Sequence, residues 1–336
     1  VTGALVAQSM APDEHRFAFA LVGAGAGVVP DIDFLARKAS EGLLFLKLHR
    51  GFTHSLLATP LIAACASGCS LWLFGTPFWH LFGVCVVAAV THMVLDTIMH
   101  STGLQWLWPL RRRLSVPLVI GLNPLTSSAR CGERSLLVCL RCTMHSALLS
   151  PLVQLLWAGF VVSLVAPPWR LVSQVTLGAW GAYMVLCALL GRVARGRLAA
   201  AGPPATRRGV YPGAFNPARW IGVSELEDGR GYQIHAIGAL SGQVALIGEH
   251  GPSAQGPAVE ASRATDTVQE VLENAVFPHA EELEASATGG TRVVWRDLAF
   301  AFSPSVALFT ARVDLNPRRE IAAEEFRERW DRNPAA

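Results

Sequence analysis

Four long, uncharged apolar segments dominate the first 200 residues of this 336-residue chain. Each has about 20 residues, the length that one helix needs to cross the hydrocarbon core of a bilayer. The four segments cover residues 55–75, 77–95, 146–167 and 171–191. A fifth, shorter apolar run at 17–29 either spans thinly or forms a broken element with residues 1–10. The pattern predicts an all-α, multi-pass membrane domain of four to five transmembrane helices over residues 1–200.

The charge balance changes near residue 200. Residues 1–200 contain 15 Lys or Arg and 7 Asp or Glu, whereas residues 201–336 contain 13 and 18. After Gly202-Pro203-Pro204, short runs bounded by turn residues replace the long apolar segments. These runs predict strands at 232–240, 243–247, 292–302 and 307–315, and helices at 265–285 and 319–329. We therefore expect residues 205–336 to form a small α+β soluble domain.

Basic residues gather in the loops at one end of the apolar segments. Residues 31–54 contain four Lys or Arg, residues 100–145 contain six and residues 192–208 contain five, whereas the turn at 76–77 contains none. Short loops rich in Lys and Arg face the cytoplasm. The two long loops and the domain at 205–336 are therefore expected on the cytoplasmic side.

Three acidic residues of the membrane half lie beside histidines at this cytoplasmic end. A two-residue turn joins the apolar segments 55–75 and 77–95, so their motif-bearing ends must be adjacent. His92 and Asp96 are four residues apart and share one face of a helix. The three polar pieces are Pro30-Asp31-Ile32-Asp33, His49-Arg50-Gly51-Phe52-Thr53-His54-Ser55 and His92-Met93-Val94-Leu95-Asp96.

The residue types of these pieces are those of a metal site. Carboxylate oxygens and imidazole nitrogens are ligands for zinc, manganese and iron, and such a set can leave one position for water. A bound ion lowers the pKa of that water and stabilises the oxygens of an ester. Carboxylates near the centre of an apolar helix cost about 2.5–3.5 kcal/mol each, which a metal would offset. We therefore predict that the three pieces bind a divalent metal.

Each piece also has a second interpretation. The two aspartates after the first apolar run are suited to ending a helix. His54, followed by Ser55, is suited to beginning one, with Thr53 or Ser55 as the cap. His92 and Asp96 would form a buried, hydrogen-bonded pair in a transporter. The metal interpretation rests on all three pieces lying at one membrane face.

The three pieces, followed by Gly103 and Trp108-Pro109, resemble the bacterial family of membrane-bound metal-dependent hydrolases. That family is also described as LexA-binding, inner-membrane-associated hydrolases. The resemblance covers residues 1–125, and the string His-Arg-Gly-x-Thr-His-Ser is its most specific element. It implies a location in the bacterial inner membrane and a distant kinship to zinc-dependent phospholipase C and nuclease folds. It also implies metal ligation by Asp31, Asp33, His49, His54, His92 and Asp96.

Two positions depart from the family pattern. Members tend to open with a Thr-His pair before a Gly-Ala-Leu run, whereas this chain begins Val1-Thr2-Gly3-Ala4-Leu5 without an initiator Met. We expect that the natural N-terminus is missing and that a ligand there was cut off or never existed. Where an Asp-Pro often follows the basic stretch, this chain has Asn123-Pro124, which gives no acidic group at that place.

The first functional hypothesis is an integral membrane hydrolase that uses zinc, with manganese or iron as alternatives. Its substrate would be a phosphoester or lipid-like molecule at the cytoplasmic membrane face. Asp33 or Asp96 would act as the general base, and Arg50 would stabilise developing negative charge.

The second hypothesis is a non-catalytic membrane scaffold, with a structural metal and a soluble domain that binds a protein partner. A transporter is a weaker third, because the polar residues gather at one membrane face and not at the midplane. The lipid bilayer is an expected partner. Specific binding to nucleic acid is not expected, because the basic residues lack interleaved aromatic residues.

Overall fold

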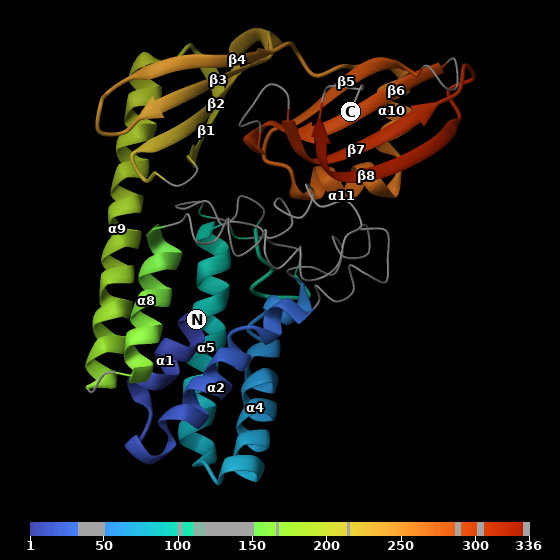
Figure 1. Ribbon diagram of the computed structural model, residues 1–336. Coiled ribbons are helices and arrows are strands. Elements are labelled where there is room, and N and C mark those ends of the chain that lie inside the picture. The colour runs from blue at the N-terminus through green and yellow to red at the C-terminus, as the bar shows by residue number, and fades with distance from the viewer. Residues whose placement is uncertain are drawn as a thin grey trace. The chain divides into compact units, whose positions relative to one another are not determined.

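The computed structural model describes a helical half followed by a half made mainly of β-strands (Figure 1). The described residues are 1–32, 51–99, 103–110, 114, 116, 151–165, 168–213, 216–285, 290–300 and 306–331. The chain divides into two units, and the boundary on the carboxyl-terminal side falls inside α9, at Ala188. Each unit has its own buried core.

The helical half contains six long helices among the described residues. α4 and α5 are joined at Gly75, whose left-handed backbone (φ 64°) lets its amide bond to the carbonyl of Leu71 and end α4. Glycine is the residue that adopts this conformation at least cost. The six helices are α1 (Thr2–Met10), α2 (Arg16–Ala26), α4 (Ala58–Phe74), α5 (Phe78–Met99), α8 (Pro151–Val165) and α9 (Trp169–Ala201).

Small residues let α1 and α2 approach at backbone distance. A Cβ placed on Gly23 would clash with the Cβ of Ala7 and would lie 2.6 Å from the carbonyl oxygen of Gly3. Contacts of this kind between small residues are typical of helices that pack inside membranes. Around this contact, Phe19 and Leu81 belong to a buried apolar cluster shared by α1, α2, α4 and α5.

Two described helices are long and apolar enough to cross a membrane: α5, over Phe78–Ile98, and α9. α4 has 17 residues, and the described apolar part of α8 is shorter still. The prediction of four to five transmembrane helices is therefore supported by two helices only. The helical character of this half is confirmed, and the number of spans stays a prediction.

The second half contains two four-stranded antiparallel sheets, in which each strand pairs with the next along the chain. Leu198 and Ala194 of α9 pack on Trp220 and Ile237 of the first sheet. The first sheet consists of β1 (Ala205–Pro212), β2 (Arg219–Leu226), β3 (Tyr232–Gly238) and β4 (Val244–His250). The second consists of β5 (Pro278–Ala285), β6 (Gly290–Asp297), β7 (Val306–Leu315) and β8 (Ile321–Asp331).

Two short helices, α10 (Pro257–Arg263) and α11 (Asp266–Asn274), lie against one face of the second sheet (Figure 1). Val259 and Val268 on these helices share a buried cluster with Trp295 and Val313 on the strands. The prediction of a region with both helices and strands after residue 205 agrees with this arrangement, although strands dominate.

One predicted helix in this half is too long and another is wrong. The helix expected at 265–285 is confirmed over α11 but ends at Asn274, and residues 278–285 form β5. The helix expected at 319–329 is β8, which pairs with β7 along most of its length. Ala, Glu and Arg in this segment favour a helix locally, but pairing with a neighbouring strand outweighs such weak preferences. β1 and β2 were not predicted, whereas the predicted strands at 232–240, 243–247 and 307–315 are confirmed. The strand predicted at 292–302 is confirmed as β6 only as far as Asp297, because a 3-10 turn over Leu298–Phe300 follows.

Candidate metal centre

Three separate segments carry the side chains of the centre. Asp31 follows α2 in a tight turn, in which its amide bonds to the carbonyl oxygen of Val28 at 2.9 Å. His54 closes a single 3-10 turn, Phe52–His54, and three residues separate it from the start of α4 at Ala58. His92 and Asp96 lie one turn apart on α5. Short turns at the ends of the packed helices α2 and α4 therefore place Asp31 and His54 level with the turn of α5 that carries His92 and Asp96.

The turn that carries His54 is fixed by its neighbours. The hydroxyl of Ser55 donates to the carbonyl of Phe52 at 2.6 Å and accepts from the amide of Ala58 at 3.2 Å. Ser55 therefore does satisfy a backbone amide at the start of α4, as one interpretation of the sequence expects. This role does not compete with a metal role for His54, because the two side chains point to different partners.

Residues 103–108 pack over the same turn. The amide of Leu56 donates to the carbonyl of Trp106, and the indole of Trp106 donates to the hydroxyl of Thr97, next to Asp96 on α5. The rings of Phe52 and Trp108 meet edge to face at 5.1 Å. The segment with Gly103 and Trp108-Pro109, part of the family resemblance, thus holds the His54 turn against α5.

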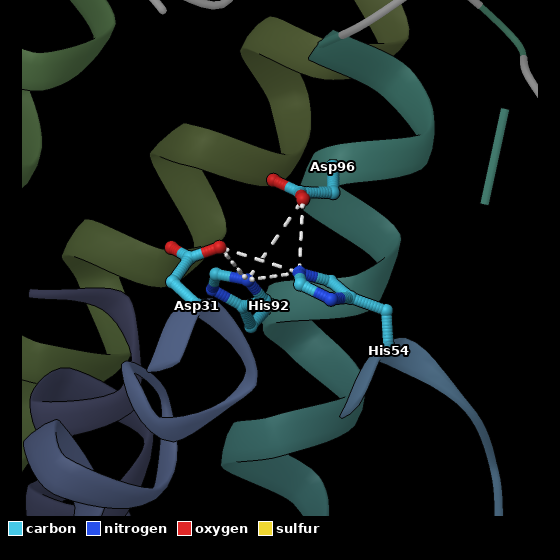
Figure 2. A group of neighbouring side chains, drawn as sticks. All are labelled: Asp31, His54, His92 and Asp96. Carbon is cyan, nitrogen blue, oxygen red and sulfur yellow. Dashed lines mark hydrogen bonds and ion pairs between the residues drawn. The ribbon is translucent and has the colours of Figure 1, made fainter. Parts of the chain in front are cut away.

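The four side chains converge on one point (Figure 2). His54 Nε2 lies 3.3 Å from Asp31 Oδ1, 3.4 Å from Asp96 Oδ2 and 3.4 Å from His92 Nε2. His92 Nε2 lies 3.5 Å from Asp31 Oδ1 and 3.9 Å from Asp96 Oδ2. One ligand atom from each residue lies within 4.8 Å of all the others. We refer to Asp31, His54, His92 and Asp96 as the Asp/His cluster.

The cluster is closed on one side and open on the other. The side chain of His54 is fully buried, whereas that of Asp31 is 45% exposed. His92 and Asp96 are between these extremes. The carboxylate of Asp31 is therefore the member of the cluster most accessible to water.

The electrostatics of the cluster favour positive charge between the carboxylates. Burial alone would raise the pKa of Asp31, but hydrogen bonds with His54 and His92 outweigh it and hold that pKa well below its usual range. Burial alone would lower the pKa of His54, but hydrogen bonds with Asp31 and Asp96 raise it to about 9. The carboxylates thus stabilise a cation placed at the imidazole nitrogens.

A neighbouring hydroxyl orients the buried imidazole. Thr53 Oγ1 lies 3.1 Å from His54 Nδ1. An Nδ1–H that donates to this oxygen leaves the lone pair of Nε2 for a cation, the usual arrangement of a metal-binding histidine. The sequence interpretation considered Thr53 only as a helix cap. Its contact with His54 depends on the geometry of the 3-10 turn, which no spacing rule predicts.

The structure brings together Asp31, His54, His92 and Asp96 from the predicted ligand set. The other predicted members, Asp33 and His49, lie outside the described residues, and so does the predicted catalytic Arg50. Among the described residues, this cluster is the one group of His, Cys, Asp and Glu side chains close enough to hold a metal ion.

Comparison with known families points to the membrane. Residues 1–165 match the family model described as YdjM inner membrane protein. The match contains the whole Asp/His cluster and ends with α8, so the region from α1 to α8 is similar to a bacterial inner-membrane protein family. No curated protein and no solved structure matches the chain. The YdjM description names neither a hydrolase activity nor LexA binding, and it does not extend to α9 or the two sheets.

Proposed function

We propose that the Asp/His cluster binds a divalent metal ion and that the protein is an integral membrane metal-dependent hydrolase. The observation that carries the proposal is the convergence of two imidazole nitrogens and two carboxylate oxygens from three segments of the chain. Zinc is the first candidate for the ion, with manganese or iron as alternatives, because all three accept this set of ligands.

The cluster fits a metal better than it fits a purely structural ion pair. A structural ion pair needs only one imidazole between the carboxylates, whereas here two Nε2 atoms lie only 3.4 Å apart and both face the carboxylates. Two imidazoles that both carry protons would repel each other at this distance. Neutral imidazoles with their lone pairs directed inward, together with two carboxylates, instead form a ligand set that a divalent cation neutralises.

The open side of the cluster favours catalysis over a purely structural role. Structural metal sites are closed by their protein ligands, whereas catalytic sites keep a position for water. The exposed side chain of Asp31 marks the side where water and substrate would enter. The site lies at the end of a helix that is apolar enough to span a membrane, so a substrate in the lipid headgroup layer would be within reach.

Each residue would have a defined task in hydrolysis. A bound divalent ion supplies an activated water and charge stabilisation at the oxygens of an ester. His54 and His92 hold their Nε2 atoms toward the common point, and Thr53 fixes the ring of His54. Asp96, or Asp33 outside the described residues, accepts a proton as general base. Arg50, which also lies outside the described residues, would stabilise the developing negative charge.

The proposed substrate is a phosphoester, either soluble or part of a lipid, at the cytoplasmic face of the bacterial inner membrane. The multi-pass topology and the cytoplasmic side rest on the distribution of Lys and Arg along the sequence. The similarity to the YdjM inner membrane protein family supports the membrane location.

A membrane scaffold is the second candidate. The full burial of His54 and its contacts with three other cluster members also suit a metal that ties Asp31 and the His54 turn to α5. The β-strand half, which lies beyond the matched family region, would then bind a protein partner.

The test uses the purified full-length chain, with metal analysis and turnover of bis(p-nitrophenyl) phosphate as readouts. Asp96→Asn removes one ligand oxygen with almost no change in shape. Asp13→Asn is the matched control, because Asp13 is exposed and pairs with Arg170 away from the cluster. We expect the unmodified chain and the control to contain metal and turn over the ester, and Asp96→Asn to lose both.

The outcomes separate the two candidates. Stoichiometric metal with no turnover of soluble or lipid phosphoesters would favour the scaffold. A chain that stays helical by circular dichroism but contains no metal, even after zinc, manganese or iron is supplied, would overturn both.

A further inference from the structure

α9 continues well beyond its apolar part. Residues 171–191 contain no charged side chain, and Arg170 and Arg192 flank them. At 1.5 Å per residue this stretch is about 31 Å long, which matches the hydrocarbon core of a bilayer. The helix then runs on without a break to Ala201. The last turns of α9 therefore project from the membrane as a rigid extension.

The first sheet is packed directly on this extension. The indole of Trp220 lies so close to Gly191 that a Cβ there would be 2.7 Å from the ring. Farther along, Ala194 and Leu198 share a buried cluster with Ile237 and Ala239 of the sheet. Because Gly191 is the last residue of the apolar stretch, Trp220 lies at the level where the hydrocarbon core ends.

The turns β1–β2 and β3–β4 lie at the same end of the sheet. The amide of Ala239 donates to the carbonyl of Ala218 at 2.7 Å and so joins the two turns. The guanidinium of Arg197 on α9 lies beside Gly242 in the β3–β4 turn. The sheet lies against the last turns of α9 (Figure 1), and because Trp220 follows the β1–β2 turn and contacts Gly191, these two turns form the end of the sheet nearest to the apolar stretch.

Positive charge gathers at this end and negative charge at the other. Residues 188–201, 209–222 and 233–248 contain no Asp or Glu. Arg192, Arg195 and Arg219 are exposed and Arg197 is half-buried. Within the described part of the chain, none of these four has a carboxylate partner. We call Arg192, Arg195, Arg197 and Arg219 the arginine end of the sheet.

The opposite end of the same sheet has a different character. Glu225, Glu227 and Glu249 lie there, and Arg207 forms an ion pair with Glu225 at 3.2 Å. Arg207 therefore has an acidic partner at that end of the sheet. Among the described residues, the sheet is thus polarised along its strands, and the arginines that lack a carboxylate partner lie at the end near Gly191.

We propose that the arginine end binds the headgroups of anionic phospholipids and seats the first sheet on the membrane surface. Arg192, Arg195 and Arg197 follow the apolar stretch by about 2, 6 and 9 Å along the helix axis. The headgroup layer is about 5–7 Å thick on each side of the core, and arginine side chains are long enough to place their charges in it. Leu240 in the β3–β4 turn is 73% exposed and contacts the lipid surface there.

Charge complementarity selects an anionic lipid over a protein as the occupant. Each basic residue near an anionic leaflet contributes about 1 kcal/mol, or about a fivefold change in affinity. The adjacent apolar stretch already fixes this end at the bilayer, so no separate encounter is needed. This inference does not depend on the metal cluster, which lies in the other half of the chain.

The first experiment measures binding of fluorescent phosphatidylglycerol and phosphatidylcholine to the full-length chain in an uncharged detergent. The test variants are Arg219→Gln, which leaves α9 unchanged, and Arg197→Gln/Arg219→Gln. The matched control is Arg207→Gln/Arg208→Gln, at the opposite end of the same sheet. We expect phosphatidylglycerol affinity to fall about fivefold for each arginine lost from the arginine end, with no change in the control.

The second experiment measures depth in vesicles that contain phosphatidylglycerol. A fluorescent amino acid at Leu240 should be quenched by brominated lipid and protected from aqueous iodide. The same amino acid at Glu227, at the opposite end, should show the reverse. Equal iodide quenching at the two positions, or equal phosphatidylglycerol affinity in test and control variants, would overturn the proposal.

Discussion

The two halves of the molecule use aspartate in opposite ways. In the helical half, Asp31 and Asp96 face two imidazoles. In the second sheet, Asp314 lies between Arg292 and Arg312, with hydrogen bonds of 2.7 and 3.1 Å to their Nε atoms. Both groups bring together side chains from separate parts of the chain, and both contain buried members.

The partner of the carboxylate decides what each group can do. A guanidinium is always charged and has no lone pair, so it neutralises Asp314 permanently and leaves no ligand for a metal. An imidazole can lose its proton and then offers a lone pair. The Asp/His cluster can therefore exchange a proton for a metal ion, whereas the Asp314 group can only hold two strands together.

The largest effect that tests this contrast is loss of metal from the helical half. His54→Asn/His92→Asn removes both imidazoles and leaves both carboxylates in place. Changing a residue that merely supports a ligand already costs 10–100-fold in metal affinity, so we expect a loss of about 100-fold or more. Metal analysis and competition with a coloured chelator measure it.

The control for this variant is His80→Asn, because His80 is exposed and lies against Phe19, away from the cluster. If the double variant kept its metal affinity, carboxylates alone would account for binding. The contrast between imidazole and guanidinium partners would then fail.

The next effect is structural and belongs to the second sheet. Asp314→Asn removes the carboxylate between Arg292 and Arg312 and leaves, among the described residues, only Glu325, 3.7 Å from Arg312, as a counter-charge. We expect the free energy of unfolding of this half to fall by about 3 kcal/mol. Denaturant titration measures this loss. Metal content should not change. A variant that lost metal without losing stability would show that the two groups are not independent.

The smallest effect is a pH dependence of stability. Burial alone would raise the pKa of Asp314, but hydrogen bonds from Arg312 and Arg292 lower it to about 2. The unfolded chain therefore binds more protons than the folded chain between about pH 2 and pH 4, and stability is lost as the pH falls through this window. The loss should be up to about 2 kcal/mol.

Thermal unfolding at a series of pH values measures this effect. Asp314→Asn has no group to protonate at this position, so its stability should change less over the same window. Parallel curves for the two proteins would assign the acid sensitivity to other carboxylates.

The sequence predicts the helical half well, because apolar length and short turns determine so much of it. Gly75 and the residues after it leave room only for an antiparallel pair of helices, and that pair places His54 close to Asp96. The position of Asp31 also follows, since α2 must end before the chain can turn toward the same side. The side-chain contact between Thr53 and His54 depends on a single 3-10 turn and could not be predicted.

The second half was harder to predict because its local preferences and its pairing disagree. Glu324, Glu325 and Arg327 belong to a segment with the composition of a helix, yet they lie on β8. Their strand conformation depends on β7, a partner that the segment itself does not reveal. In α11 the apolar pattern was correct, but Pro278, a helix-breaking residue that begins β5 four residues after Asn274, was not used to end the predicted helix.

The contact of Gly23 with Gly3 and Ala7 has a consequence for the metal cluster. Asp31 follows α2 only eight residues after Gly23, so the position of α2 relative to α1 sets the position of this carboxylate. An added methyl group at Gly23 would push the two backbones apart, because the atoms it meets cannot rotate away. The position of the Asp31 carboxylate in the cluster thus depends on a glycine, because only a residue without a side chain lets α2 lie this close to α1.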